Sequence, residues 1–175
     1  LAIQPELARG TLVRLAQLQA TEINDWRDAQ PGKMLHELRR DELTQLNQLP
    51  YTPYYGTIDT TLLWITTLAE AYRWTADVSL LNECRDALEK ALQWIDQFGD
   101  FDSDGFVEYQ TRSAQGLRNQ GWKDSGDSMV YPNGKLVDPP IALCEVQGYV
   151  YQAWNCAAEI YEVWDHSERA KELRR

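Results

Sequence analysis

Two carboxylates lie three residues apart in the segment NQGWKDSGDS, which spans residues 119–128. Asp124 and Asp127 are accompanied there by the indole ring of Trp122, by Lys123 and by two glycines. An aromatic ring can stack on the C–H face of a sugar, and carboxylates accept hydrogen bonds from its hydroxyl groups. Cleavage of a glycosidic bond needs two carboxyl groups flanking the bond, one of them protonated. These residues therefore predict a carbohydrate site, whereas the simpler interpretation is that both aspartates are solvated loop residues.

Further candidates lie beside two apolar runs. In PYTPYYGTIDTTLLWI, residues 50–65, Tyr55 and Asp59 stand where the apolar run begins. Asp59 has two interpretations, as a ligand of sugar hydroxyls or as a first-turn acid that complements the helix dipole. Glu145 lies within the second run, where an unpaired charge is costly. It therefore either pairs with a base such as Lys123 or faces the site.

Hydrophobic periodicity predicts helices of two kinds. Residues 8–27 and residues 77–98 each carry one apolar stripe and one polar face. Residues 57–75 and 141–164 are apolar around nearly the whole helix, and such helices must be surrounded by protein. A polar segment that begins at Ser167 predicts a fifth helix.

Capping residues indicate where two of these helices begin and end. Asp77 or Ser79 is suited to be an N-cap, and Gly99 is suited to end the same helix. Asp138 followed by Pro139 is suited to begin the helix of residues 141–164.

The alternation of one-faced and fully apolar helices predicts an all-α fold. We expect a single domain over residues 1–175 that forms part of an (α/α)6 toroid, with about two and a half helical hairpins and long loops at one end. A helical solenoid is the alternative, but its helices are usually all amphipathic. The connections 28–56 and 99–140 are far longer than ordinary helix connections, which indicates a functional role.

Charge and composition narrow the classes of partner. The formal net charge of the chain is −10, so neither nucleic acid nor an anionic membrane is expected as a partner. No apolar run is long enough to span a bilayer and no signal peptide is visible, which predicts a cytoplasmic protein.

The cysteines and histidines show no metal-binding spacing. The three cysteines, Cys84, Cys144 and Cys156, lack CxxC spacing and are interpreted as small core residues of a reduced protein. His36 and His166 lie too far apart in the sequence for a zinc signature.

We expect no cofactor, with calcium as the one alternative. Asp100, Asp102, Asp104 and Gly105 match the first half of a calcium-binding loop. The twelfth position is Thr111 in place of the usual bidentate glutamate, and Glu108 is the nearest substitute.

Five sequence blocks, in order along nearly the whole chain, resemble the bacterial amylo-α-1,6-glucosidase or glycogen-debranching-type proteins. These blocks are QPGKMLHEL (30–38), YYGTIDTTLLW (54–64), DSDGFVEYQ (102–110), GLRNQGWKDSGDS (116–128) and IALCEVQGYVY (141–151). The resemblance implies a six-hairpin α/α toroid and an inverting glycoside hydrolase that acts on α-glucan or a related α-glucoside.

The resemblance also implies residue roles. Asp124 matches the general acid, with Asp127 as the second choice, and Asp59 matches an acid that binds hydroxyls of the sugar. The catalytic base of the family lies downstream of residue 175. The residues expected to bind substrate are Tyr55, Asp59, Trp122, Lys123, Asp127 and Glu145.

The chain begins at Leu1 and ends within a helical pattern at Arg175, so we expect it to be part of a longer protein. Alone, it is expected to lack hydrolytic activity and either to self-associate or to pack against the remainder of the toroid. The alternative function is a non-catalytic carbohydrate-binding or structural helical module.

Overall fold

The computed structural model describes residues 4–123 and 125–174 of the chain. Within these residues the fold is all-α, as expected, and contains isolated β-bridges but no strand. The helices are α1 (Pro5–Gln17), α2 (Glu42–Gln45), α3 (Thr60–Thr75), α4 (Val78–Glu83), α5 (Arg85–Phe98), α6 (Cys144–Val163) and α7 (Ser167–Leu173), with a 3-10 turn η1 at Asp25–Arg27. None of the helices in the described residues combines the length and the apolar character needed to cross a membrane.

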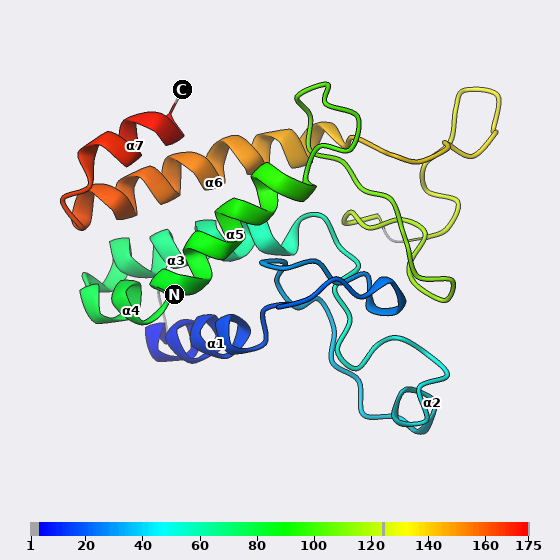
Figure 1. Ribbon diagram of the computed structural model, residues 1–175, viewed down its shortest axis with the longest axis horizontal. Coiled ribbons are helices and arrows are strands. Elements are labelled where there is room, and N and C mark those ends of the chain that lie inside the picture. Colours follow the sequence, from blue (N-terminus) through cyan, green and yellow to red (C-terminus); the bar gives the residue numbers. More distant parts are fainter. Residues whose placement is uncertain (1–3, 124, 175) are drawn as a thin grey trace.

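Helices and loops occupy opposite ends of the molecule (Figure 1). Helices α1, α3, α4, α5, α6 and α7 fill one end, and the two long loops, together with the short helix α2, fill the other. Both α3 and α6 begin at the loop end, whereas α1 and α5 run toward it. The two predicted long connections therefore do emerge at a common end of the helices.

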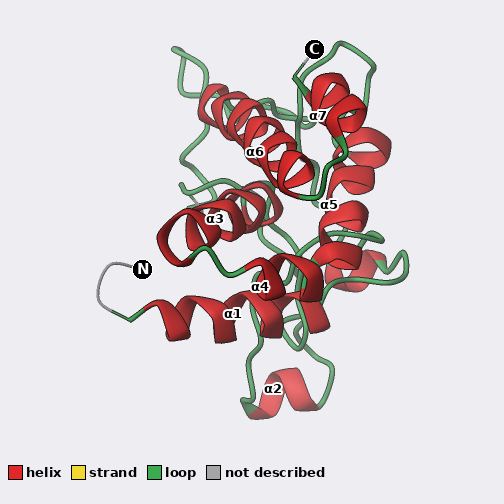
Figure 2. Ribbon diagram, turned by 90° about the vertical axis from the view of Figure 1, so that its left-hand side faces the viewer, coloured by secondary structure: helices red, strands yellow, loops and turns green. Residues whose placement is uncertain are grey.

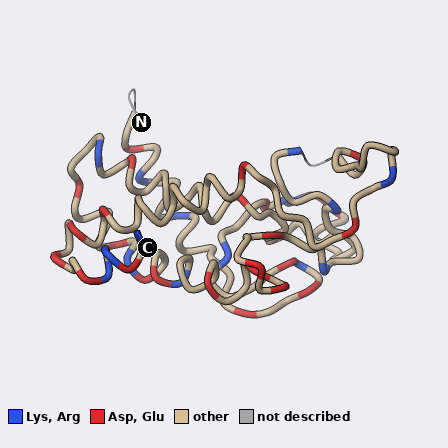
Figure 3. The backbone as a smooth tube through the Cα atoms, turned by 90° about the horizontal axis from the view of Figure 1, so that it is seen from above, with Lys and Arg blue, Asp and Glu red and all other residues tan. Residues whose placement is uncertain are grey.

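The helices pack in two layers. Viewed from the side in Figure 2, α3 and α6 lie next to each other, and α5 and α7 lie on the opposite side of the core. The principal core joins residues from both layers, among them Leu62, Ile65 and Leu68 of α3 with Leu88 and Leu92 of α5. Acidic and basic positions are interspersed along the surface of both ends (Figure 3).

The central helices α3 and α6 are not covered on every side. Leu63 on α3 is 41% exposed and Tyr151 on α6 is 72% exposed, while Leu62 and Ala153 on the same helices are fully buried. The sequence predicts burial around nearly the whole circumference of both helices, whereas each has one open face in this chain.

Helix α1 ends at Gln17, well before the predicted end at residue 27. The reason is that hydrogen bonds to distant parts of the chain begin directly after Gln17. The backbone of Ala20 exchanges two hydrogen bonds with the Gly32–Lys33 turn, at 2.9 and 3.0 Å. The side chain of Gln19 donates to the carbonyl oxygens of Gly32 and Ala87. Ile23, which lies within the predicted helix, is 62% exposed.

Two further helix boundaries differ from the prediction, whereas the cap at Asp77 and the end of α5 at Gly99 agree with it. Asp77 caps α4 by accepting a hydrogen bond from the N–H of Leu80 at 3.1 Å, but the predicted helix is divided at Cys84 into α4 and α5. Asp138 does not cap α6, which begins at Cys144. The backbone of Ile141 is paired in both directions with that of Tyr109, and this pairing keeps the preceding residues out of the helix.

Candidate functional site

The two long loops are joined by the buried carboxylate of Asp28. This residue is 3% exposed, and its backbone lies in the left-handed region with φ 49°. One carboxylate oxygen accepts from the backbone N–H groups of Arg112 (2.6 Å) and Ser113 (3.2 Å). The other accepts from three side chains, those of Tyr54 (2.8 Å), Thr111 (3.2 Å) and Gln120 (3.3 Å). We call this arrangement the Asp28 hub.

The hydroxyl group of Tyr54 is the second element of the hub. It donates to Asp28 and accepts the backbone N–H of Leu117 at 2.7 Å. The side chain is fully buried, and this burial raises the pKa of Tyr54 well above the range of a solvated tyrosine. Both neighbouring glycines approach it too closely to carry a side chain, since a Cβ at Gly56 or Gly116 would lie 2.0 or 2.5 Å from the hydroxyl oxygen.

The second loop continues from the hub to the residues just before α3. The carbonyl oxygen of Gln120 accepts the backbone N–H of Ile58 at 2.8 Å. The adjacent Asn119 is 1% exposed, and its amide group donates to the carbonyl oxygen of Ser125 and to the hydroxyl group of Ser128. That hydroxyl in turn donates to the carbonyl oxygen of Lys123 at 2.8 Å. The residues on either side of position 124 are therefore held by side chains of the same loop.

Asp59 occupies the N-cap position of α3 but makes no capping hydrogen bond through its side chain. Burial raises the pKa of its carboxyl group, and that increase is partly opposed by a hydrogen bond from its own backbone N–H, by the nearby imidazole of His36 and by hydrogen bonds from Thr60. Asp59 is half-buried where the second loop meets α3, and its carboxylate accepts from the first residue of the helix, Thr60. This position agrees with an acid that complements the helix dipole, and the role in binding sugar hydroxyls stays a prediction.

Trp122, Lys123 and Glu145 meet at the start of α6. Glu145 is the second residue of the helix, closer to its end than the apolar pattern indicated. Its pKa is lowered, first by a hydrogen bond from its own backbone N–H and then by the side chains of Cys144, Trp122 and Lys123. The ammonium group of Lys123 lies 5.1 Å from the ring centroid of Trp122, and the Trp122 side chain is 65% exposed. An accessible aromatic ring thus lies next to a cation and a carboxylate.

The remaining sequence-predicted residues are placed differently. Tyr55 is buried in a small cluster with Ala20, Ala29 and Leu35, and its hydroxyl group donates to the carbonyl oxygen of Leu18. Asp127 is exposed in the second loop. Asp124, the expected general acid, lies outside the described residues.

The acidic loop before Tyr109 holds a group that could bind a cation. One oxygen atom each of Asp100, Asp102 and Glu108 lies within 4.8 Å of the others, and Glu108 is buried. Asp104, which the sequence included in the ligand set, accepts the N–H of Phe106 instead. Asp100 already accepts hydrogen bonds from the N–H groups of three residues of its own loop, as it would in a turn without metal. Calcium at this loop stays a prediction.

One cysteine departs from the expectation that all three belong to the core. Cys84 and Cys156 are buried, whereas Cys144 is exposed at the start of α6. Its sulfur lies 3.5 Å from a carboxylate oxygen of Glu145, so this thiol belongs to the rim of the candidate site.

Lys33 is a buried cation beside the hub that the sequence did not indicate. The side chain is 5% exposed and its ammonium group donates to the backbone carbonyl of Asp28 at 3.4 Å. Burial lowers the pKa of Lys33 to about 8. Sequence reasoning also missed Asp28, Tyr54 and Asn119, because their partners are distant in the chain and produce no local spacing.

No known family model matches this sequence, and no curated protein matches it.

Proposed function

We propose that this chain is a segment of an inverting glycoside hydrolase that acts on α-glucan or a related α-glucoside, and that Asp124 is its general acid. The observation that supports the proposal most is the meeting of Trp122, Lys123 and Glu145 at the start of α6. The same loop bonds to Ile58, the neighbour of Asp59, through Gln120. Acidic and aromatic groups from three separate parts of the sequence are thus gathered at one end of the helices.

The arrangement fits recognition of a neutral sugar. The exposed ring of Trp122 offers a stacking surface, and the carboxylates of Asp59 and Glu145 offer acceptors for hydroxyl groups. Lys123 balances part of the negative charge at this rim. In the proposed reaction Asp124 protonates the glycosidic oxygen, and a carboxylate from downstream of residue 175 activates water on the opposite face. Inversion requires roughly 6.5–9.5 Å between the two carboxyl groups, so that the water fits between them.

We further propose that the helices form part of an (α/α)6 toroid. Two features support this arrangement: α3 and α6 lie in parallel with their starts at the loop end, and each has one open face. In a complete ring, further central helices would cover Leu63 of α3 and Tyr151 of α6. Those helices would come from the same protein.

The decisive experiment measures hydrolysis by the full-length protein. Asp124→Asn is expected to lower kcat for an α-1,6-branched dextrin at least about a hundredfold, because a general acid typically contributes 10²–10⁴ in rate. Asp138→Asn, which changes an exposed aspartate of the same loop outside the candidate site, is the matched control and is expected to keep most of the activity. Unchanged turnover in the Asp124→Asn protein would contradict the proposal.

A binding experiment tests the site independently of the reaction. Maltohexaose is titrated into this chain and into its Trp122→Ala variant by calorimetry. The variant is expected to bind at least about tenfold more weakly, since covering a large apolar side chain is worth about 1.5–3 kcal/mol. Binding together with no hydrolysis by the full-length protein would favour the non-catalytic carbohydrate-binding module.

A further inference from the structure

The segment between Tyr109 and Gln120 depends on the Asp28 hub for most of its anchoring. Tyr109 is paired with Ile141, and Gln120 is bonded to Ile58. Between these two points, the only hydrogen bond between backbone groups in the described structure is the local one from Gly116 to Ser113. The segment is otherwise attached through Asp28 and Tyr54, through the contact of Tyr51 with Gln115 and the partly exposed ion pair of Arg112 with Asp25, and through the side chain of Asn119 near its end.

The Asp28 hub is held by directional hydrogen bonds, and its buried groups have few other partners within reach. All five donors to the Asp28 carboxylate approach a side chain that is 3% exposed, so water cannot readily replace a lost partner. A Cβ at Gly116 would lie 2.5 Å from the Tyr54 hydroxyl oxygen and 2.8 Å from a carboxylate oxygen of Asp28. The segment is therefore held at one distance from the first loop.

The candidate site begins immediately after this anchored segment. Gln120 contacts Asp28 through its side chain and Ile58 through its backbone, and Trp122 follows two residues later. A shift of Gln120 would therefore move Trp122 and Lys123 relative to Asp59. Asp28 itself is buried, so a sugar stacked on the exposed ring of Trp122 would not touch it.

We propose that Asp28 is a positioning residue: it fixes the segment Thr111–Gln120 against the start of α3 and thereby sets the place of Trp122 and Lys123 beside Asp59 and Glu145. The role in substrate binding rests on the proposed function, whereas the role in loop placement does not. The site is thus assembled by a carboxylate that does not contact the sugar.

The test uses Asp28→Asn, which keeps the size of the side chain but removes its charge and one acceptor oxygen. Amide hydrogen exchange at Arg112, Ser113 and Leu117 is expected to become at least about tenfold faster, because the segment loses hydrogen bonds to a charged group. The amides of α3 and α6 are expected to exchange at their original rates. The indole N–H resonance of Trp122, assigned with a Trp122→Phe variant, is expected to shift, while that of the buried Trp64, which donates to Leu12 at the helical end, stays in place.

Two additional variants keep the test decisive. Tyr54→Phe removes one donor to Asp28 and the acceptor for Leu117, and is expected to give the same pattern even if Asp28→Asn fails to fold. Asp77→Asn is the matched control, because it removes a carboxylate that accepts a backbone N–H at the helical end. Asp77→Asn is expected to affect the start of α4 and to leave the Trp122 resonance unchanged.

The outcomes separate this inference from the proposed function. Titration with maltohexaose is expected to show about tenfold weaker binding in Asp28→Asn and Tyr54→Phe. Absence of binding to the original protein would contradict the proposed function, while exchange and the Trp122 resonance would still decide the role of Asp28. An unchanged Trp122 resonance together with unchanged exchange of the loop amides in Tyr54→Phe would overturn the inference.

Discussion

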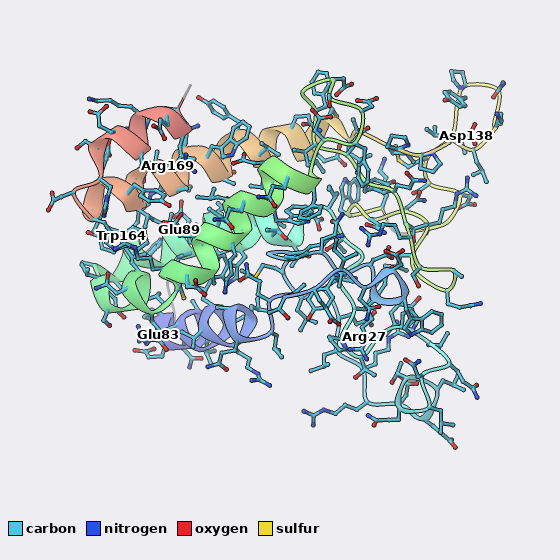
Figure 4. The ribbon with its side chains drawn as sticks, viewed as in Figure 1. Arg27, Glu83, Glu89, Asp138, Trp164 and Arg169 are labelled. Carbon is cyan, nitrogen blue, oxygen red and sulfur yellow. The ribbon has the colours of Figure 1, made fainter. Side chains whose placement is uncertain are left out.

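The helical end and the loop end of this molecule are stabilised by different kinds of contact. At the helical end, large apolar side chains such as Leu68, Leu88 and Trp94 are almost completely buried. At the loop end, the buried groups include Asp28, Lys33 and several polar side chains. Figure 4 locates the two ends, with Glu83, Glu89, Trp164 and Arg169 labelled among the helices and Arg27 and Asp138 among the loops. Of the polar residues that are buried, Gln19, Asp28, Gln30, Lys33, Thr57, Glu108, Ser113, Asn119 and Gln120 lie outside the helices.

The difference shows how the two ends can serve different purposes. Apolar contacts have little directional preference, so a helical core tolerates small shifts of its members. A buried carboxylate with five donors tolerates few, because each group that loses its partner stays unsatisfied away from water. The loop end therefore has less regular secondary structure than the helical end, but the positions of its buried hydrogen-bonding groups are more strictly defined. That combination suits loops that must present separate side chains to one ligand.

The largest effect is expected from a cavity in the helical core. Leu68→Ala removes a fully buried side chain of α3, and such changes cost about 2–5 kcal/mol in the free energy of unfolding. Because the helical core supports both ends, urea denaturation of the variant should show one transition, with its midpoint at a lower urea concentration than in the original protein. The measurement is circular dichroism at increasing urea concentration.

Leu63→Ala on the same helix is the matched control for that change. Leu63 is 41% exposed, so its truncation is expected to cost less than about 1 kcal/mol. A similar loss in both variants would show that the open face of α3 is covered in solution, for example in a dimer. Size-exclusion chromatography of the two proteins would distinguish that case.

The contrast also explains which parts of the structure could be predicted from the sequence. Helical periodicity identified the longer helices and the alternation of α3 and α6 with one-faced helices, because the apolar stripe is a local pattern, but it missed the short helix α2. It placed the first helix end wrongly, since the contacts of Gln19 and Ala20 with Gly32 and Ala87 are made across the chain. Local residue type could not indicate those partners.

The same reasoning applies to the candidate site. Trp122, Lys123 and Glu145 were each predicted to bind substrate, with pairing of Glu145 to a base such as Lys123 as an alternative, and the structure brings the three side chains together. Asp28 was not predicted, although five donors converge on its carboxylate at the loop end. Its partners Arg112 and Gln120 lie 84 and 92 residues away in the sequence, and no spacing rule connects positions so distant.

The second-largest expected effect is a pH dependence of the free energy of unfolding, which originates from Lys33 at the loop end. The pKa of Lys33 is lowered to about 8 by burial, from 10.5 in the unfolded chain. Between these values the unfolded state holds more protons than the folded state, so the contribution of Lys33 to the free energy of unfolding increases as the pH rises. Below pH 8 the buried ammonium group destabilises the fold by a constant amount.

Lys33→Met removes that charge while keeping an unbranched side chain. At pH 7 the variant is expected to be more stable by about 1–3 kcal/mol, after the loss of the hydrogen bond to Asp28 is subtracted. The difference between the two proteins should shrink as the pH is raised from 8 toward 10.5. Urea denaturation at pH 7, 8 and 9 measures it, and because only the difference is used, the ionisation of buried tyrosines and cysteines cancels. A difference that does not change with pH would contradict the burial of a lysine with a lowered pKa at this position.

The smallest expected effect comes from a pair of glycine-to-alanine substitutions, one in the helices and one at the loop end. Gly148 lies within α6, and a methyl group added at its Cα would meet no atom within 4 Å. Gly148→Ala is therefore expected to stabilise the protein by about 0.5–1 kcal/mol through helix propensity. Gly116→Ala places the same methyl group against Tyr54 and Asp28, and is expected to destabilise by about 1–3 kcal/mol. Thermal denaturation of the two variants should therefore shift the midpoint in opposite directions. If Gly116→Ala were neutral, the hub would have room to move, and the strict geometry attributed to the loop end would be wrong.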